Sequence, residues 1–170
     1  MQPLRLTLFT LGLVLSTASQ AAQTRMGPNT TVSFEAGKSA LSNTEKDKLK
    51  KLLADARSSG KVKQVQIATW SDNFIPSGKK ELSKADRKLA TLRSKSIQNY
   101  LDRQLNVKDF TIHNMAERST WLSRMFETDD AVLKTEISEN PDLPMSKTEF
   151  KVFKDNGEPS SSVVLVIYNK

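Results

Sequence analysis

The sequence predicts a domain in which α-helices pack on a β-sheet, and three observations lead to this fold class. Segments with the alternating pattern of strands take turns with segments of helical periodicity, in the order strand, helix, strand, helix, strand, helix, strand. The chain closes with a run of apolar residues at 163–168, as expected of a central strand buried on both faces. Roughly 150 residues follow the N-terminal segment, which is enough for one domain with one core.

The first 21 residues have the three parts of a secretory signal peptide. One charged residue, Arg5, precedes an apolar run at 8–15, and small residues lead up to Ala21. The apolar run is too short for a permanent membrane span, which needs about twenty apolar residues. We therefore expect residues 1–21 to be removed during export, with an uncleaved anchor as the alternative.

The remainder is expected to be a single domain at 31–170, preceded by a flexible leader at 22–30 that contains Gly27 and Pro28. The chain has no cysteine, which excludes disulfides, thiolate chemistry and the lipid attachment site of bacterial lipoproteins. These features predict a soluble periplasmic protein that is not a lipoprotein and has no transmembrane segment once the signal is cleaved.

Hydrophobic spacing and helix-terminating residues place the individual elements. Ser42 and Glu45 have the spacing of a capping box, and the helix that they begin stops at Gly60. Its predicted apolar face consists of Leu49, Leu52, Leu53 and Ala56.

Further elements follow from the same rules. Strands are predicted at 32–34, 65–69 and 110–112, helices at about 86–101 and 121–137, and an exposed loop at 73–84, while 143–162 fits a strand or a short helix. The helix at 86–101 has Leu89, Leu92, Ile97, Tyr100 and Leu101 as its predicted apolar set, and Trp121 is expected in the core.

The charge balance favours an anionic partner. The chain carries 26 basic and 19 acidic residues, a net charge of +7 that falls to +6 when Arg5 leaves with the signal. Nucleic acid is the first candidate that such a balance suggests. Export, together with lysines spread along helices rather than interleaved with aromatic residues, favours solvated helix faces instead. We therefore expect no nucleic-acid partner.

Signatures of enzymes are nearly absent. His113 is the only histidine, so a catalytic triad would have to be built around that single ring. Zinc sites need several histidine or cysteine ligands, and neither the phosphate-binding glycine loop nor the dinucleotide fingerprint occurs. By default His113 is a surface or packing residue, and the sequence predicts no catalysis, no metal and no cofactor.

Asp72 and Arg93 are the candidate binding residues. Asp72 stands where the second strand ends, at the rim of the predicted sheet. Arg93 lies four residues after Leu89 and four before Ile97, so it shares a helix face with apolar positions. If the fold brings the two together, the carboxylate can take a ligand ammonium group and the guanidinium a ligand carboxylate. The alternative, which spacing alone favours, is a structural salt bridge between them.

Several short motifs, in a fixed order, resemble the OmpA-like peptidoglycan-binding domain. The family pattern runs V-x-F, then G-x-T-D, then N-x-x-L-S-x-x-R-A-x-x-V-x-x-Y-L. Its counterparts here are Val32-Ser33-Phe34, Thr69-Trp70-Ser71-Asp72 and the helix segment at 89–101. The resemblance covers nearly all of the chain after the signal. It implies an α+β two-layer sandwich in the order β-α-β-α-β-α-β with a mixed four-stranded sheet.

The resemblance also implies functional roles. In the family, an aspartate and a helix arginine hold the zwitterionic end of diaminopimelate in the peptide stems of peptidoglycan, and the matching residues here are Asp72 and Arg93. Ser71 takes the place of the family threonine, and Asp86 that of the family asparagine. The sequence departs from the pattern at Thr69, at 114–117, at 160–162 and in a longer loop before Asp86.

Two functions of different classes follow. The resemblance implies non-covalent binding of peptidoglycan in the cell envelope through Asp72 and Arg93, aided by the positive charge. The alternative is a diverged domain that binds another envelope protein through the loop at 73–84 and the segment at 142–158. A wall-active enzyme is disfavoured by the poverty of histidine and cysteine.

Overall fold

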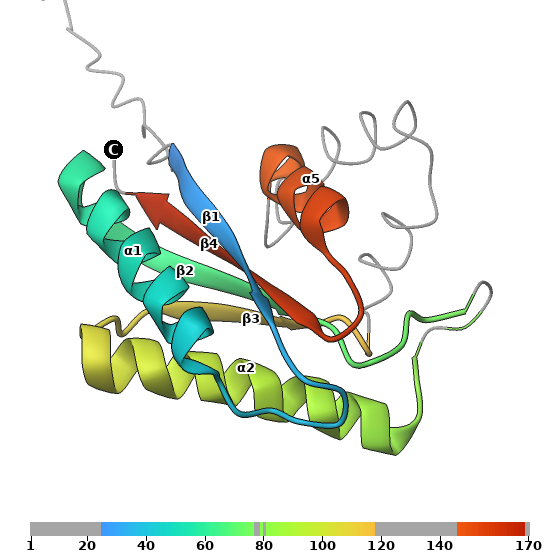
Figure 1. Ribbon diagram of the computed structural model, residues 1–170. Coiled ribbons are helices and arrows are strands. Elements are labelled where there is room, and N and C mark those ends of the chain that lie inside the picture. The colour runs from blue at the N-terminus through green and yellow to red at the C-terminus, as the bar shows by residue number, and fades with distance from the viewer. Residues whose placement is uncertain (1–24, 77–78, 80, 118–145, 169–170) are drawn as a thin grey trace, which may run out of the picture.

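The computed structural model describes residues 25–76, 79, 81–117 and 146–168. Within them, strands and helices alternate in the predicted order β-α-β-α-β-α-β (Figure 1). The elements are β1 (Arg25–Ser33), α1 (Asn43–Ser59), β2 (Val62–Thr69), α2 (Lys84–Leu105), β3 (Phe110–Asn114), α5 (Lys147–Asn156) and β4 (Ser161–Tyr168). The predicted α+β fold class is confirmed.

The four strands form one mixed sheet in the order β1-β4-β2-β3. β4 pairs antiparallel with β1 and with β2, while β2 and β3 run parallel. Every residue of β4 is buried, which confirms the predicted central strand. Because the last strand lies between the first and the second, segments far apart in the sequence are adjacent throughout the sheet.

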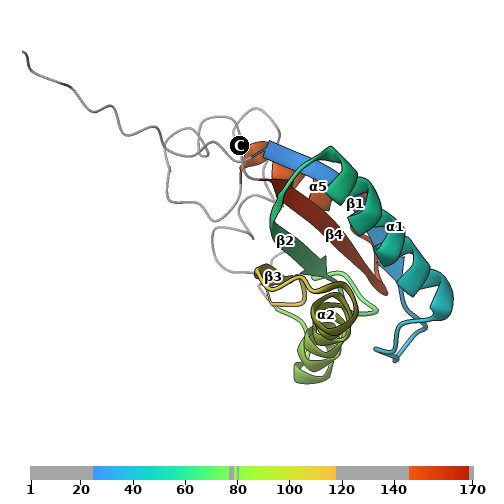
Figure 2. The same cartoon turned by 90° about the vertical axis from the view of Figure 1, so that its left-hand side faces the viewer.

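Helices lie against both faces of this sheet. Figures 1 and 2 show α1 and α2 side by side on one face of the sheet and α5 on the other. The sheet and the α1–α2 pair form the two layers that were predicted, and α5 is an additional helix on the opposite face. The core between the sheet and the α1–α2 layer contains the predicted face of α1. Its fully enclosed side chains include Val32, Leu49, Leu53, Ala56, Val65, Ile67, Ile97, Leu101, Val164 and Val166.

A second core lies on the α5 face. It contains Ala68, Trp70, Met115, Phe150, Phe153, Val163, Leu165 and Ile167. Trp70 is 1% exposed, and its ring packs against the turn that follows α5. The turn approaches so closely because it contains Gly157: a Cβ atom there would lie 2.1 Å from Cζ2 of Trp70 and 2.7 Å from the carbonyl of Phe153.

We expect Gly157→Ala to lower the free energy of unfolding by about 1–3 kcal/mol, as overpacked cores do. Gly157 has a φ of −81°, which alanine also adopts, so the loss would come from the close contacts of the new methyl group with Trp70 and the carbonyl of Phe153 and not from backbone strain. Gly60→Ala is the matched control, because its Cβ would meet Tyr168 at an ordinary 3.6 Å. Urea unfolding of the two variants tests this, and equal midpoints would show that the turn moves aside freely.

Helix α1 begins and ends as predicted. Ser42 is its N-cap and accepts a hydrogen bond from the backbone N–H of Glu45, and Gly60 follows its last turn. The carboxylate of Glu45 forms an ion pair with Lys48, with 2.9 Å between Oε1 and Nζ. Helix α2 extends beyond the predicted 86–101 at both ends. It begins at Lys84, because the hydroxyl of the N-cap residue Ser83 accepts a hydrogen bond from the backbone N–H of Asp86.

One predicted member of the apolar face of α2 is exposed. Leu92 is 42% exposed, although it was expected among the apolar contacts of this helix. The buried face instead runs through Ala90, Arg93, Ser94, Ile97 and Leu101. A helical turn of 3.6 residues places position 92 about 100° away from position 93, so the two cannot both face the sheet.

The prediction of a leader without structure at 22–30 is wrong for residues 25–30, which belong to β1. Gly27 and Pro28 suggested a chain break, but the strand accommodates them with a register shift between Met26 and Asn29. β1 is an edge strand, where the missing N–H of proline and a local bulge are tolerated. Gly27 also lets the strand approach the ring of Tyr168, which a Cβ would meet at 2.8 Å.

The sequence at 143–162 fitted either a strand or a short helix, and the structure has the helix α5 there. This helix begins at a complete capping box formed by Ser146 and Glu149. The predicted signal peptide at 1–21, the helix at 121–137 and Trp121 lie outside the described residues. No helix in the described ranges combines the length and the apolar character that crossing a bilayer requires.

Candidate functional site

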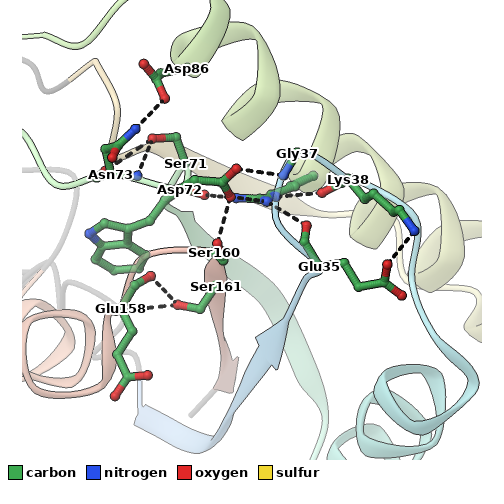
Figure 3. A network of polar contacts seen from close by, with 12 residues as sticks. Glu35, Gly37, Lys38, Ser71, Asp72, Asn73, Asp86, Glu158, Ser160 and Ser161 are labelled. Atoms are coloured by element: carbon green, nitrogen blue, oxygen red, sulfur yellow. Dashed lines mark hydrogen bonds and ion pairs between the residues drawn. The ribbon is translucent and has the colours of Figure 1, made fainter.

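The candidate site lies beyond the end of β2, where three loops meet the middle of α2. Asp72 follows β2 by three residues, and Arg93 lies in the third turn of α2. Gly37 comes from the loop after β1, and Ser160 is the residue directly before β4 (Figure 3). Because β2 and β4 run antiparallel, the end of one strand adjoins the start of the other.

Arg93 is completely enclosed, with 0% of its side chain exposed. Its Nε donates to the carbonyl of Lys38 at 2.9 Å, and Nη1 donates to the carbonyl of Trp70 at 3.2 Å. Nη2 donates to the carbonyl of Glu35 at 3.2 Å and to Oδ1 of Asp72 at 2.5 Å. The guanidinium also lies over the ring of Phe34, 5.1 Å from its centroid. Arg93 therefore ties the loop after β1, the end of β2 and helix α2 together.

Asp72 is the partly exposed member of the pair, with 27% of its side chain accessible. Besides the bond from Arg93, Oδ1 accepts the hydroxyl of Ser160 at 2.7 Å, and Oδ2 accepts the backbone N–H of Gly37 at 2.6 Å (Figure 3). Burial raises the pKa of this carboxyl, but the hydrogen bonds from Ser160, Arg93 and Gly37 outweigh it and hold the pKa below its usual value. Asp72 therefore presents a fixed negative charge at the surface.

The other two predicted site residues, Ser71 and Asp86, belong to a neighbouring network. Ser71 is fully buried, and its hydroxyl exchanges hydrogen bonds with the backbone of Asn73 at 3.1 and 3.2 Å. Asn73 donates to Asp86 at 3.2 Å, and Ser83 donates to the same carboxylate at 2.6 Å. The Ser83 bond is the main reason that the pKa of Asp86 lies below its usual value. This network anchors the start of the loop after β2 to the first turn of α2.

The fold thus brings Asp72 and Arg93 into contact and places Asp86 one step away, through Asn73. The ion pair that spacing alone favoured is formed. Four of the five N–H donors of the guanidinium bond to protein acceptors, so Arg93 acts mainly inside the protein and Asp72 faces outward.

Sequence reasoning missed the residues that complete the site. Ser160 was noted only as a departure from the family pattern, and Gly37 was not singled out. Ser160 has a φ of +58°, unusual for a non-glycine residue, and its N–H donates to the carbonyl of Ser71 at 2.6 Å. Antiparallel pairing of the second and last strands would have pointed to it, because this pairing aligns Thr69 with Ser162.

Three further observations bear on the chemistry. His113 lies on β3, is 9% exposed, and faces Phe153 with 5.8 Å between ring centroids. In the part of the chain that the structure describes, no three His, Cys, Asp or Glu side chains gather as metal ligands. A cleft of about 530 Å³ lies next to the site and shares Phe34, Glu35 and Lys38 with it.

Several solved structures resemble the chain in arrangement, and one of them is an OmpA-like domain. No protein-family model matches the chain, and no curated protein matches its sequence. The chain is similar to the OmpA-like domain of FopA1 from Francisella tularensis subsp. tularensis SCHU S4, with a TM-score of 0.42 and 12% sequence identity. The match covers 83% of this chain and 72% of the other. At this identity and TM-score the likeness carries no argument about the ligand.

Proposed function

We propose that this protein binds peptidoglycan non-covalently in the cell envelope, with the outward-facing carboxylate of Asp72 as the primary contact. The observation that carries the proposal is the state of that carboxylate, which is ionised, rigidly held and 27% exposed. The ligand group that fits it is an ammonium group, such as the one at the zwitterionic end of diaminopimelate.

The hydrogen bonds of Asp72 leave room for such a group. A carboxylate offers about four acceptor positions, and Gly37, Ser160 and Arg93 fill three of them. The open position is on Oδ2, which accepts only the N–H of Gly37 among the described residues. In this proposal Arg93 is a positioning residue, because it holds Asp72 in place and keeps its charge.

Asp72→Asn is expected to weaken binding to purified peptidoglycan sacculi by roughly ten- to a hundredfold. The amide keeps the size of the side chain but loses the charge, and a hydrogen bond to a charged group contributes about 1.5–3 kcal/mol. Co-sedimentation of the purified protein with sacculi over a range of protein concentrations measures the change.

Asp55→Asn is the matched control, because it removes the same charge from an exposed position on α1. We expect it to bind like the wild type. If both variants bind alike and moderate salt releases them alike, the attraction comes from the net charge of +7 and the proposal fails.

A second candidate is a module that binds another envelope protein. The observation that favours it is Phe74, which is 50% exposed on the loop after β2, two residues from Asp72. A large exposed ring on a loop anchored by Asn73 and Asp86 suits a protein contact.

A photo-crosslinking amino acid at position 74 tests this second candidate in cells. It should capture one defined protein, whereas the same amino acid at Leu92, also exposed but on α2, should not. A defined adduct together with no binding to sacculi would favour the protein-binding function over wall binding.

A further inference from the structure

A basic cleft lies at the opposite end of the sheet from Asp72. It is found where α1 and α2 end and where β2 begins, at the left in Figure 1. Its volume is about 410 Å³, within the range of small-ligand sites. The lining residues are Arg57, Gly60, Lys61, Val62, Lys63, Asn106, Val107, Lys108 and Asp109.

The fold uses only two of the four cations that line this cleft. Arg57 donates from Nη2 to the carbonyl of Leu105, which ties the end of α1 to the end of α2. Lys108 forms an ion pair with Asp102. Lys61 and Lys63, by contrast, are exposed and form no ion pair with any residue that the structure describes.

The cleft consequently carries an excess of positive charge. Its four cations have two carboxylates beside them, Asp109 in the lining and Asp102 next to Lys108, which leaves about +2 from the side chains. The C-terminal ends of α1 and α2 at the cleft reduce this excess by about half a charge each, to about +1. A phosphate monoester carries about −1.5 to −2 at pH 7 and three acceptor oxygens, so it suits the positive sign of the cleft and the donors of lysine and arginine.

We propose that the basic cleft binds a phosphate-bearing ligand, with Lys61 and Lys63 as its main contacts and Arg57 as a preoriented third donor. The cleft and Asp72 adjoin opposite ends of β2, whose eight residues span roughly 25 Å. The two sites are therefore separate, and this proposal does not depend on peptidoglycan binding.

The first experiment measures thermal unfolding of the purified protein in glycerol phosphate, against sodium chloride at the same ionic strength. At ten times the Kd, the phosphate ester should raise Tm by about 3–6 °C. The double variant Lys61→Gln/Lys63→Gln should lose this shift. Lys88→Gln/Lys95→Gln, which removes two exposed lysines from α2, should keep it, as should Asp72→Asn.

A second arm identifies the source of the phosphate. The wild type and the same double variants are co-sedimented with phosphatidylcholine vesicles, with and without phosphatidylglycerol. A response to either probe that disappears only in Lys61→Gln/Lys63→Gln supports the site, and the probe that gives it distinguishes a soluble ester from a lipid headgroup. A response that survives in that variant, or no response to either probe, overturns the proposal.

Discussion

Replacing Arg93 with methionine is expected to lower the free energy of unfolding by about 3–5 kcal/mol, the usual loss when one partner of a buried ion pair is removed. Methionine leaves the carbonyls of Glu35, Lys38 and Trp70 without their donor, and it leaves Asp72 without its counterion. Lysine should not restore the loss, because a single ammonium cannot reach four acceptors in the plane of a guanidinium. Urea unfolding at neutral pH measures all three proteins.

Arg87→Met on the same helix is the matched control. Arg87 pairs with Glu81, but 26% of its side chain and 56% of that of Glu81 are exposed. Exposed pairs of this kind contribute up to about 1 kcal/mol. If Arg93→Met were no more harmful than Arg87→Met, the guanidinium would not hold the three segments together, and a direct ligand contact would become its main role.

Acidification is expected to destabilise the protein between about pH 6.5 and pH 4 through His113. Burial lowers the pKa of this imidazole from its ordinary 6.5 to about 4, so in this interval the unfolded chain binds a proton that the folded protein excludes. The stability that this provides is complete above about pH 6.5 and is lost as the pH falls to about 4. A shift of this size corresponds to roughly 3 kcal/mol.

His113→Gln should remove this dependence, since His113 is the only histidine of the chain. Denaturant unfolding at several pH values compares the two slopes. Below about pH 4 both proteins should continue to lose stability, because Asp72 has a lowered pKa in the folded state and must then be protonated. An equally steep fall in His113→Gln above pH 4 would mean that other groups take up the protons.

The elements that could be predicted are those whose signal is local. The apolar face of α1 recurs at helical spacing behind the cap at Ser42, and the apolar run at 163–168 leaves no polar side for solvent. The start of β1 could not be predicted in this way. Gly27 and Pro28 indicate a chain break, and only the distant partner strand β4 makes residues 25–30 a strand.

The candidate site also has a part that the sequence could predict and a part that depends on contacts between distant segments. Contact between Asp72 and Arg93 was one of the two arrangements considered from spacing, and the structure forms the ion pair. The three carbonyls that enclose Arg93 could not be foreseen, since every residue has a carbonyl and only the path of the loops selects which ones converge. Ser160 is near Asp72 through strand pairing, which no local motif reports.

The central position of β4 has a consequence for the order of folding. β4 is the last described element to be synthesised, yet β1 pairs with no other described strand, and β2 has only the short β3 as another neighbour. Until residues 161–168 have left the ribosome, neither core can close around the sheet. Such long-range pairing makes assembly slow, because the closure of the long loop between β1 and β4 must precede the formation of either core.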